Sequence, residues 1–245
     1  MTQATQAIAE FIHRSSAADF PDQAIEKSKK IIADTIASIL SGANSEVTEH
    51  LLTYLKMSGE SGDSPVIGTA ERSSPEMAAL INGTFGHALD FDDVLSMMPA
   101  HPSAIIVAVL LADLKRQPLS GKALIEAHVI GVEVGGKIGL GITTGHYHRG
   151  FHGTGTLGIF CGVAALAKAW RLQPDVIQTA FGIAGPVVDD AVVTTNLPWH
   201  IRAASLREKL GTPHVRLLND LEATAYGALV LPAEKLQTLN AGVAR

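Results

Sequence analysis

Apolar residues recur at helical spacing through the first three quarters of the chain. Between residues 22 and 43, isoleucine and leucine repeat every three or four positions, which predicts one amphipathic helix. Ser74 followed by Pro75 is typical of a helix start, and Pro102 is expected to open a central helix that is apolar nearly all round. The same spacing predicts helices over residues 46–57, 74–89, 102–116, 121–138 and 155–172. We therefore expect a mainly α-helical domain over residues 1–182.

The pattern changes after residue 185. "AVVTT" (191–195) and "VRLLN" (215–219) are rich in β-branched or long apolar residues and predict short strands. Each is followed by a helical pattern, "AASLREKLG" and "LEATAYGALVL". Residues 183–245 are therefore expected to form a short α/β segment.

Composition excludes several classes of partner. The chain has 245 residues, 47% of them hydrophobic, and a net charge of -5 without a long run of one sign, so nucleic acid is not an expected partner. No stretch reaches about 18 uninterrupted apolar residues and no signal-peptide pattern is present, so we expect a cytoplasmic protein without a membrane partner. Cys161 is the only cysteine, so one chain forms no disulfide and holds no iron–sulfur cluster.

The candidate chemistry is concentrated in one region, because six of the ten histidines lie between residues 87 and 152. Two polar segments stand there between apolar helices, "NGTFGHALDFDDVLSMMPAHPSA" and "GHYHRGFHGTGTLG". Arginine and helix N-termini bind carboxylates, and histidine transfers protons near neutral pH. The residue types therefore indicate a polycarboxylate site that works without a cofactor, since the cysteine count rules out an iron–sulfur cluster.

Each of these residues has a purely structural alternative. His146 and His148 are the kind of loop histidine that caps a helix or lies on the surface. The aspartates of "DFDD" (90–93) are equally suited to capping a helix. A metal site built from Asp90, Asp92 and "HYHRGFH" is conceivable, but the spacing is loose, and the expectation is that no metal is bound.

Several separated motifs resemble one family. "VIGTAERSSPEMAALINGTFGHALDFDDV", "AHPSA", "GVEVGGKIG" and "GFHGTGTLGIFCGVAALAKAWRL" are similar to the MmgE/PrpD family, which contains 2-methylcitrate dehydratase and cis-aconitate decarboxylase. The resemblance runs from about residue 5 to residue 184. It implies a cofactor-independent lyase, usually a homodimer, whose main domain is all-helical and whose substrate is a small tricarboxylate.

The motifs also carry residue roles. Asp90 of "DFDD", His101 of "HPSA" and His152 of "GFHGT" correspond to catalytic positions of the family, and Arg149 is a candidate for binding a substrate carboxylate. Val94 stands where some members have threonine or serine, so the resemblance leaves open whether elimination or decarboxylation occurs.

The last part of the chain resembles a different family. From residue 182 onward, "TTNLPW" and "LLNDLEA" are similar to bacterial glucokinases, which implies part of an α/β domain related to actin. By motif, Asp220 would be the base toward a sugar hydroxyl, and Asn196 and Asn219 would bind the sugar; the alternative is that Asn219 or Asp220 caps the next helix. The segment supplies neither a phosphate cradle nor a Mg²⁺ site, so a complete glucokinase is not expected.

The residues "GIAG" (182–185) are common to both patterns, which predicts a fused or misassembled reading frame. The lyase family places catalytic lysines beyond this point, so we expect impaired catalysis, and we expect "AVVTT" to lack strand partners. A sugar kinase fragment and a non-catalytic helical module that self-associates through apolar faces remain the alternatives.

Overall fold

The computed structural model describes residues 2–142, 145–181, 187–188, 191–193, 200–202 and 204. The chain divides into two compact units, of which the first comprises residues 3–181 and the second residues 182–245.

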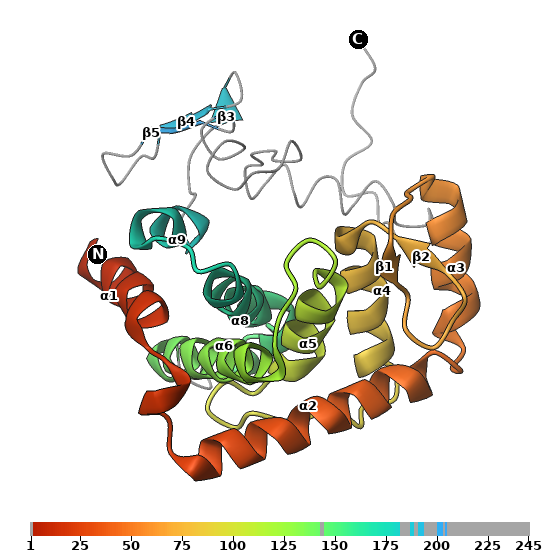
Figure 1. Ribbon diagram of the computed structural model, residues 1–245, viewed down its shortest axis with the longest axis horizontal. Helices are drawn as coiled ribbons and strands as arrows, with labels where there is room; N and C mark the ends of the chain where they lie inside the picture. The colour runs from red at the N-terminus through yellow and green to blue at the C-terminus, as the bar shows by residue number, and fades with distance from the viewer. Residues whose placement is uncertain are drawn as a thin grey trace. The chain divides into compact units, whose positions relative to one another are not determined.

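The first unit is mainly helical, as predicted (Figure 1). The described helices are α1 (Thr2–Arg14), α2 (Asp22–Gly42), α3 (Val47–Ser58), α4 (Pro75–His87), α5 (Pro102–Ala112), α6 (Gly121–Ile142), α7 (Gly145–His148), α8 (Gly153–Ala169) and α9 (Pro174–Phe181). A 3-10 turn, η1 (Ala17–Asp19), follows α1, and β1 (Ser64–Pro65) pairs antiparallel with β2 (Arg72–Ser73). None of the described helices is long and apolar enough to cross a membrane.

The predicted helix starts are confirmed at α4 and α5. The Ser74 hydroxyl accepts the N–H of Met77 at 3.3 Å, and Pro75 is the first residue of α4. Pro102 opens α5, but this helix ends at Ala112 and not at residue 116. After Ala112 the chain forms a turn in which the Asp113 carbonyl accepts the N–H groups of Arg116 and Gln117, and the Asp113 carboxylate accepts from Trp170 Nε1 at 2.6 Å.

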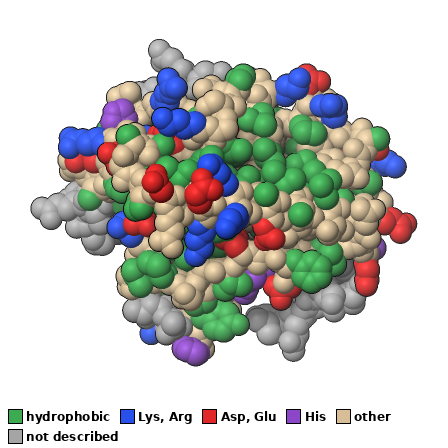
Figure 2. Space-filling view, turned by 60° about the horizontal axis from the view of Figure 1, so that its bottom comes forward, with side chains coloured by type: hydrophobic (Ala, Val, Ile, Leu, Met, Phe, Trp, Pro, Cys, Tyr) green, Lys and Arg blue, Asp and Glu red, His purple; other side chains and the backbone are tan. Residues whose placement is uncertain are grey.

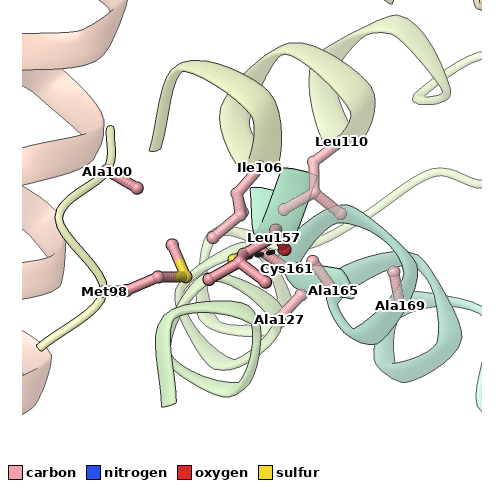
Figure 3. Packing of buried hydrophobic residues seen from close by; sticks show 9 residues of the cluster. All are labelled: Met98, Ala100, Ile106, Leu110, Ala127, Leu157, Cys161, Ala165 and Ala169. Carbon is pink, nitrogen blue, oxygen red and sulfur yellow. Dashed lines mark hydrogen bonds between the residues drawn. The ribbon is translucent and has the colours of Figure 1, made fainter. Parts of the chain in front are cut away.

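The core forms where α5, α6 and α8 pack together, as expected for a helix that is apolar all round. Ile106 and Leu110 of α5 contact a cluster that includes Leu157 and Cys161 of α8 (Figure 3). The Cys161 thiol donates to the carbonyl of Leu157 at 3.8 Å, and burial raises the pKa of this thiol to about 12. Cys161 is therefore an uncharged core residue.

Helix α2 packs against α4, α5 and α6 through a face of small and apolar residues. Its last residue, Gly42, touches the backbone of α4 so closely that an added Cβ would overlap the carbonyl group of Phe85. We therefore expect Gly42→Ala to lower the free energy of unfolding by about 2 kcal/mol, because the end of α2 must move off α4.

The matched control is Gly141→Ala near the end of α6, where an added Cβ meets none of the described residues within 4 Å. Helix propensity predicts that this variant is as stable as the parent or up to about 1 kcal/mol more stable. Urea unfolding followed by circular dichroism measures both variants. Equal stability of the two would contradict the close approach of α2 and α4.

Charged side chains on the surface are interspersed by sign. Figure 2 shows a face on which basic and acidic side chains lie beside one another, next to a broad area of apolar side chains. Ion pairs such as Lys29 with Glu26 at 2.6 Å and Lys137 with Glu133 at 2.9 Å join neighbouring turns of one helix. The face drawn in Figure 2 therefore shows no field of one charge.

In the second unit, the described residues include three short strands. They are β3 (Val187–Val188), β4 (Ala191–Val193) and β5 (His200–Arg202), in an antiparallel sheet of order β3-β4-β5. Val192 pairs with Val187 on one side and with Ile201 on the other. The strand predicted at 191–195 is thus present over 191–193, and the expectation that it lacks strand partners was wrong. The other elements predicted for this segment lie outside the described residues.

Candidate functional site

Three histidines from separate parts of the first unit meet at one place. His87 ends α4, His101 precedes α5 and His152 precedes α8. The ring centroids of His87 and His101 are 4.5 Å apart, and the His152 ring is 6.0 Å from the first and 6.2 Å from the second. We call these three residues the histidine cluster. The structure thus brings together the two imidazoles, His101 and His152, that the sequence predicts to act on the same substrate.

The starts of α5 and α8 are joined by a hydrogen bond and by close packing of their backbones. Thr154 Oγ1 accepts the N–H of His101 at 2.9 Å. Gly153 lies so close to the loop before α5 that an added Cβ would be 2.5 Å from the carbonyl oxygens of both Met98 and Pro99. His101 and His152 are the N-cap residues, but neither side chain caps its helix. Both imidazoles therefore remain available to a ligand at two adjoining helix N-termini.

Two carboxylates flank the His101 ring. Asp92 is fully buried; its Oδ2 lies 3.0 Å from Nδ1 of His87, and its Oδ1 lies 3.4 Å from Nδ1 of His101. The second contact lacks hydrogen-bond geometry, so the buried Nδ1 of His101 has no hydrogen-bond partner among the described residues. On the other side, Asp90 Oδ1 is 3.7 Å from Nε2 of His101.

Asp90 owes its position to an unusual backbone conformation. Its φ of 56° is left-handed, a region that aspartate visits more readily than most residues. This turn directly after α4 sends the chain back, so that Asp92 reaches the ring of His87 five residues earlier. Asp90 itself is 82% exposed, on the solvent side of the cluster.

A buried chain of hydrogen bonds connects the loop before α5 to α6 and α2. Ser103 donates through its N–H and its hydroxyl to Asp93, at 3.1 and 2.8 Å. Nε2 of His128, on α6, lies 3.0 Å from the Ser103 hydroxyl, and Nδ1 lies 2.9 Å from the hydroxyl of Ser28 on α2. Because the single proton of the Ser103 hydroxyl goes to Asp93, the proton of His128 sits on Nε2, and Ser28 donates to Nδ1.

Burial changes the pKa of two members of this chain, His128 and Asp93. It lowers the pKa of His128 to about 4, so the ring is neutral near pH 7. It also raises the pKa of Asp93, an effect that the two hydrogen bonds from Ser103 oppose. Ser103 follows His101 by two residues, so the chain from Ser28 to Asp93 ties α2 and α6 to the part of the backbone that carries His101.

The low pKa of His128 predicts an acid-sensitive fold. The unfolded chain protonates His128 near pH 6.5, whereas the folded chain does so only near pH 4. The stability that comes from keeping His128 neutral is therefore complete above pH 6.5 and is lost as the pH falls toward 4. Between pH 7 and pH 5 the parent should lose about 2 kcal/mol more stability than a His128→Gln variant. Asp93, whose pKa is raised, acts in the opposite direction but is present in both proteins.

Urea unfolding at the two pH values measures the difference. Trp170 fluorescence reports on the first unit if Trp199, outside the described residues, is first replaced by phenylalanine in both proteins. The same loss of stability in parent and variant would show that His128 is protonated in the folded state as easily as in the unfolded one.

A groove borders the histidine cluster at His87, one of the residues that line it. It has a volume of about 560 Å³, and its walls come from α4, α5 and α8. Leu80, Ile105 and Val109 contribute apolar surface, whereas His87 and Thr154 contribute polar groups beside the cluster. A volume of this order suits a small organic ligand.

Of the other predicted site residues, the structure describes Arg149 alone. Arg149 is exposed in the turn after α7, and its contact with a carboxylate stays a prediction. Asn196, Asn219 and Asp220 lie outside the described residues. Sequence reasoning missed His87 and Asp92 as partners; the spacing of a histidine five residues before an aspartate was the available signal.

Comparison with known proteins identifies both parts of the chain. The model of the MmgE/PrpD N-terminal domain matches residues 6–196, and the glucokinase model matches residues 162–245. Both resemblances seen in the sequence are thereby confirmed, and the two matches overlap over residues 162–196.

Individual relatives agree with the family models. Human cis-aconitate decarboxylase is 30% identical over 241 residues, which cover 91% of this chain and 50% of that protein. The cis-aconitate decarboxylase-like protein oryM of Aspergillus oryzae is 29% identical over 174 residues, 68% of this chain and 36% of that protein. Glucokinase of Synechocystis is 42% identical over 66 residues, 27% of this chain and 19% of that protein.

The chain thus spans half or less of the length of these relatives. The MmgE/PrpD match, in contrast, covers more than half of this chain and includes the whole histidine cluster. The chain therefore belongs to the MmgE/PrpD family.

Proposed function

We propose that the histidine cluster is a lyase site for a small tricarboxylate, of the kind that 2-methylcitrate or cis-aconitate represents. The observation that carries the proposal is the meeting of His101 and His152 at two helix N-termini. Each N-terminus presents partial positive charge, which stabilises a carboxylate. The adjoining groove gives such an acid a route to the cluster.

His101 is the proposed proton-transfer group. In an elimination, a base takes a proton from the carbon next to a carboxylate, and an acid gives a proton to the hydroxyl that leaves as water. In a decarboxylation, the C–C bond electrons remain on carbon as CO₂ leaves, and an acid then protonates that carbon. Imidazole suits either task, and the carboxylates of Asp90 and Asp92 lie on opposite sides of the His101 ring.

The assay uses the purified full chain in EDTA with each acid in turn. Because cis-aconitate decarboxylases are among the relatives, cis-aconitate is the first substrate to test. With cis-aconitate, proton NMR follows the loss of the vinyl signal of the substrate, and an alkaline trap collects the released CO₂ as carbonate. With 2-methylcitrate, a new vinyl signal reports dehydration. Turnover above the rate in buffer supports the proposal, and no turnover of either acid counts against it.

The glucokinase match supplies a second candidate function. We infer that Asp220 would be the base and that Asn196 and Asn219 would bind glucose, as the motifs imply. Glucose-dependent formation of ADP, measured by a coupled assay, tests this candidate separately from the lyase. ADP formation that persists in Asp220→Asn would exclude it.

The resemblance also motivates a homodimer in the cytoplasm. Light scattering during gel filtration tests the first point; a monomer at micromolar concentration would contradict it. Fractionation of the source cells tests the second.

A further inference from the structure

We propose that the histidine cluster is also a binding site for a divalent transition-metal ion of the Zn²⁺ type. The ion would take one nitrogen from each of His87, His101 and His152 and would leave a fourth position open toward the groove. Metal binding itself does not depend on the proposed function, but the predicted effect of the metal on activity rests on it. A metal on these nitrogens removes the lone pairs that proton transfer needs, so the metal-bound chain is inactive as a lyase.

The spacing of the three rings fits a shared ion. One nitrogen from each ring lies within 4.8 Å of the nitrogens chosen from the other two. Tetrahedral Zn²⁺ with bonds of about 2.0–2.1 Å requires ligand nitrogens roughly 3.4 Å apart. The three ligands come from three helix ends, and Thr154 fixes the start of α5 against that of α8.

The buried carboxylate of Asp92 supplies the support that such sites use. A ligating histidine usually donates its second ring N–H to a carboxylate, which fixes the tautomer and the ring orientation. His87 has this arrangement, because its Nδ1 is 3.0 Å from Asp92 Oδ2, and its Nε2 is thereby the nitrogen with the lone pair. The Nδ1 of His101 is buried 3.4 Å from the same carboxylate without a hydrogen bond. A metal on Nε2 of His101 would turn this orphaned atom into a donor for Asp92.

The ligand set decides the class of metal. Three imidazole nitrogens favour Zn²⁺, Co²⁺, Ni²⁺ and Cu²⁺ over Mg²⁺ and Ca²⁺, which prefer oxygen. A second possible set replaces His152 by the carboxylates of Asp90 and Asp92. We favour the three histidines because Asp92 is already engaged with His87 and because Asp90 is 82% exposed.

The test uses the full chain, freed of metal with EDTA and then dialysed, with Co²⁺ as the spectroscopic probe and no substrate present. One Co²⁺ per chain is expected to give the intense visible absorption of tetrahedral cobalt, to be displaced by Zn²⁺ and to be unaffected by Mg²⁺. His87→Asn and His152→Asn should each weaken Co²⁺ binding at least tenfold. Asp92→Asn should weaken it about 10–100-fold through the supporting hydrogen bond.

Two variants serve as controls. His148→Asn removes a histidine from the loop that carries His152 but not from the cluster, and it should leave Co²⁺ affinity unchanged. Asp90→Asn should do the same if the three histidines are the ligands. Urea unfolding of each variant identifies any that lose binding only because they lose the fold.

Three outcomes would overturn the proposal: a weak, octahedral cobalt spectrum, equal loss of binding in His148→Asn, or binding that is lost in Asp90→Asn but retained in His152→Asn. Since no acid substrate is present, these outcomes are independent of the lyase assay. A chain that binds Co²⁺ but turns over no tricarboxylate refutes only the proposed function.

Discussion

Replacing His101 by asparagine is expected to lower kcat/KM for the tricarboxylate by about 10²–10⁴-fold, the usual contribution of a positioned acid or base. Asparagine cannot transfer the proton, but it is of similar size and well suited to the N-cap position of α5. The backbone N–H that Thr154 accepts is also retained. The loss should therefore appear in initial rates and not in the urea midpoint.

The control for this variant is His50→Asn. His50 is an exposed histidine on α3, outside the histidine cluster, and its replacement should leave kcat/KM at the value of the parent chain. A His101→Asn protein that is folded and as active as the parent would remove His101 from the reaction.

Gly153→Ala is expected to have the second large effect, because it acts on both the fold and the site. The new Cβ would stand 2.5 Å from the carbonyl oxygens of Met98 and Pro99 and 3.0 Å from Cβ of Ala100, so the start of α8 must move away from the loop before α5. Overpacking against backbone atoms should cost about 3 kcal/mol of unfolding free energy. His152 would move with α8, and kcat/KM should fall at least tenfold, as expected when a catalytic geometry is displaced by roughly 1 Å.

Gly155→Ala is a closely matched control, since it adds the same methyl group two residues later in the first turn of α8, where no atom of the described part of the chain lies within 4 Å. It should keep both the urea midpoint and kcat/KM of the parent. If Gly153→Ala is equally harmless, the start of α8 does not fix the distance between His152 and His101.

Local sequence patterns predicted most of the helices in the first unit. The Ser74 cap, the prolines that open α4 and α5, and the apolar repeat of α2 are signals that residues a few positions apart carry by themselves. The end of α5 at Ala112 was missed, and so was the contact of Asp113 just after it, which comes from Trp170, 57 residues away. Periodicity contains no information about such a partner.

The site was only partly predictable for the same reason. The motifs pointed to His101 and His152, which the fold brings together, although their roles stay predictions. The hydrogen bond of His87 with Asp92 follows the left-handed backbone at Asp90, which the residue type permits but does not require. The contact of His128 with Ser28 spans 100 residues of sequence, so a lone histidine on an apolar helix gave no sign of it.

Binding of a tricarboxylate at the histidine cluster is the central claim, and nitrogen NMR of the full chain with labelled histidine tests it without requiring turnover. Signals are assigned by single His→Asn variants in EDTA, and cis-aconitate is then added to saturation. We predict that the ring signals of His87, His101 and His152 shift together with one dissociation constant, while those of His13 and His50 stay in place. Unmoved signals for the three cluster histidines would contradict the account.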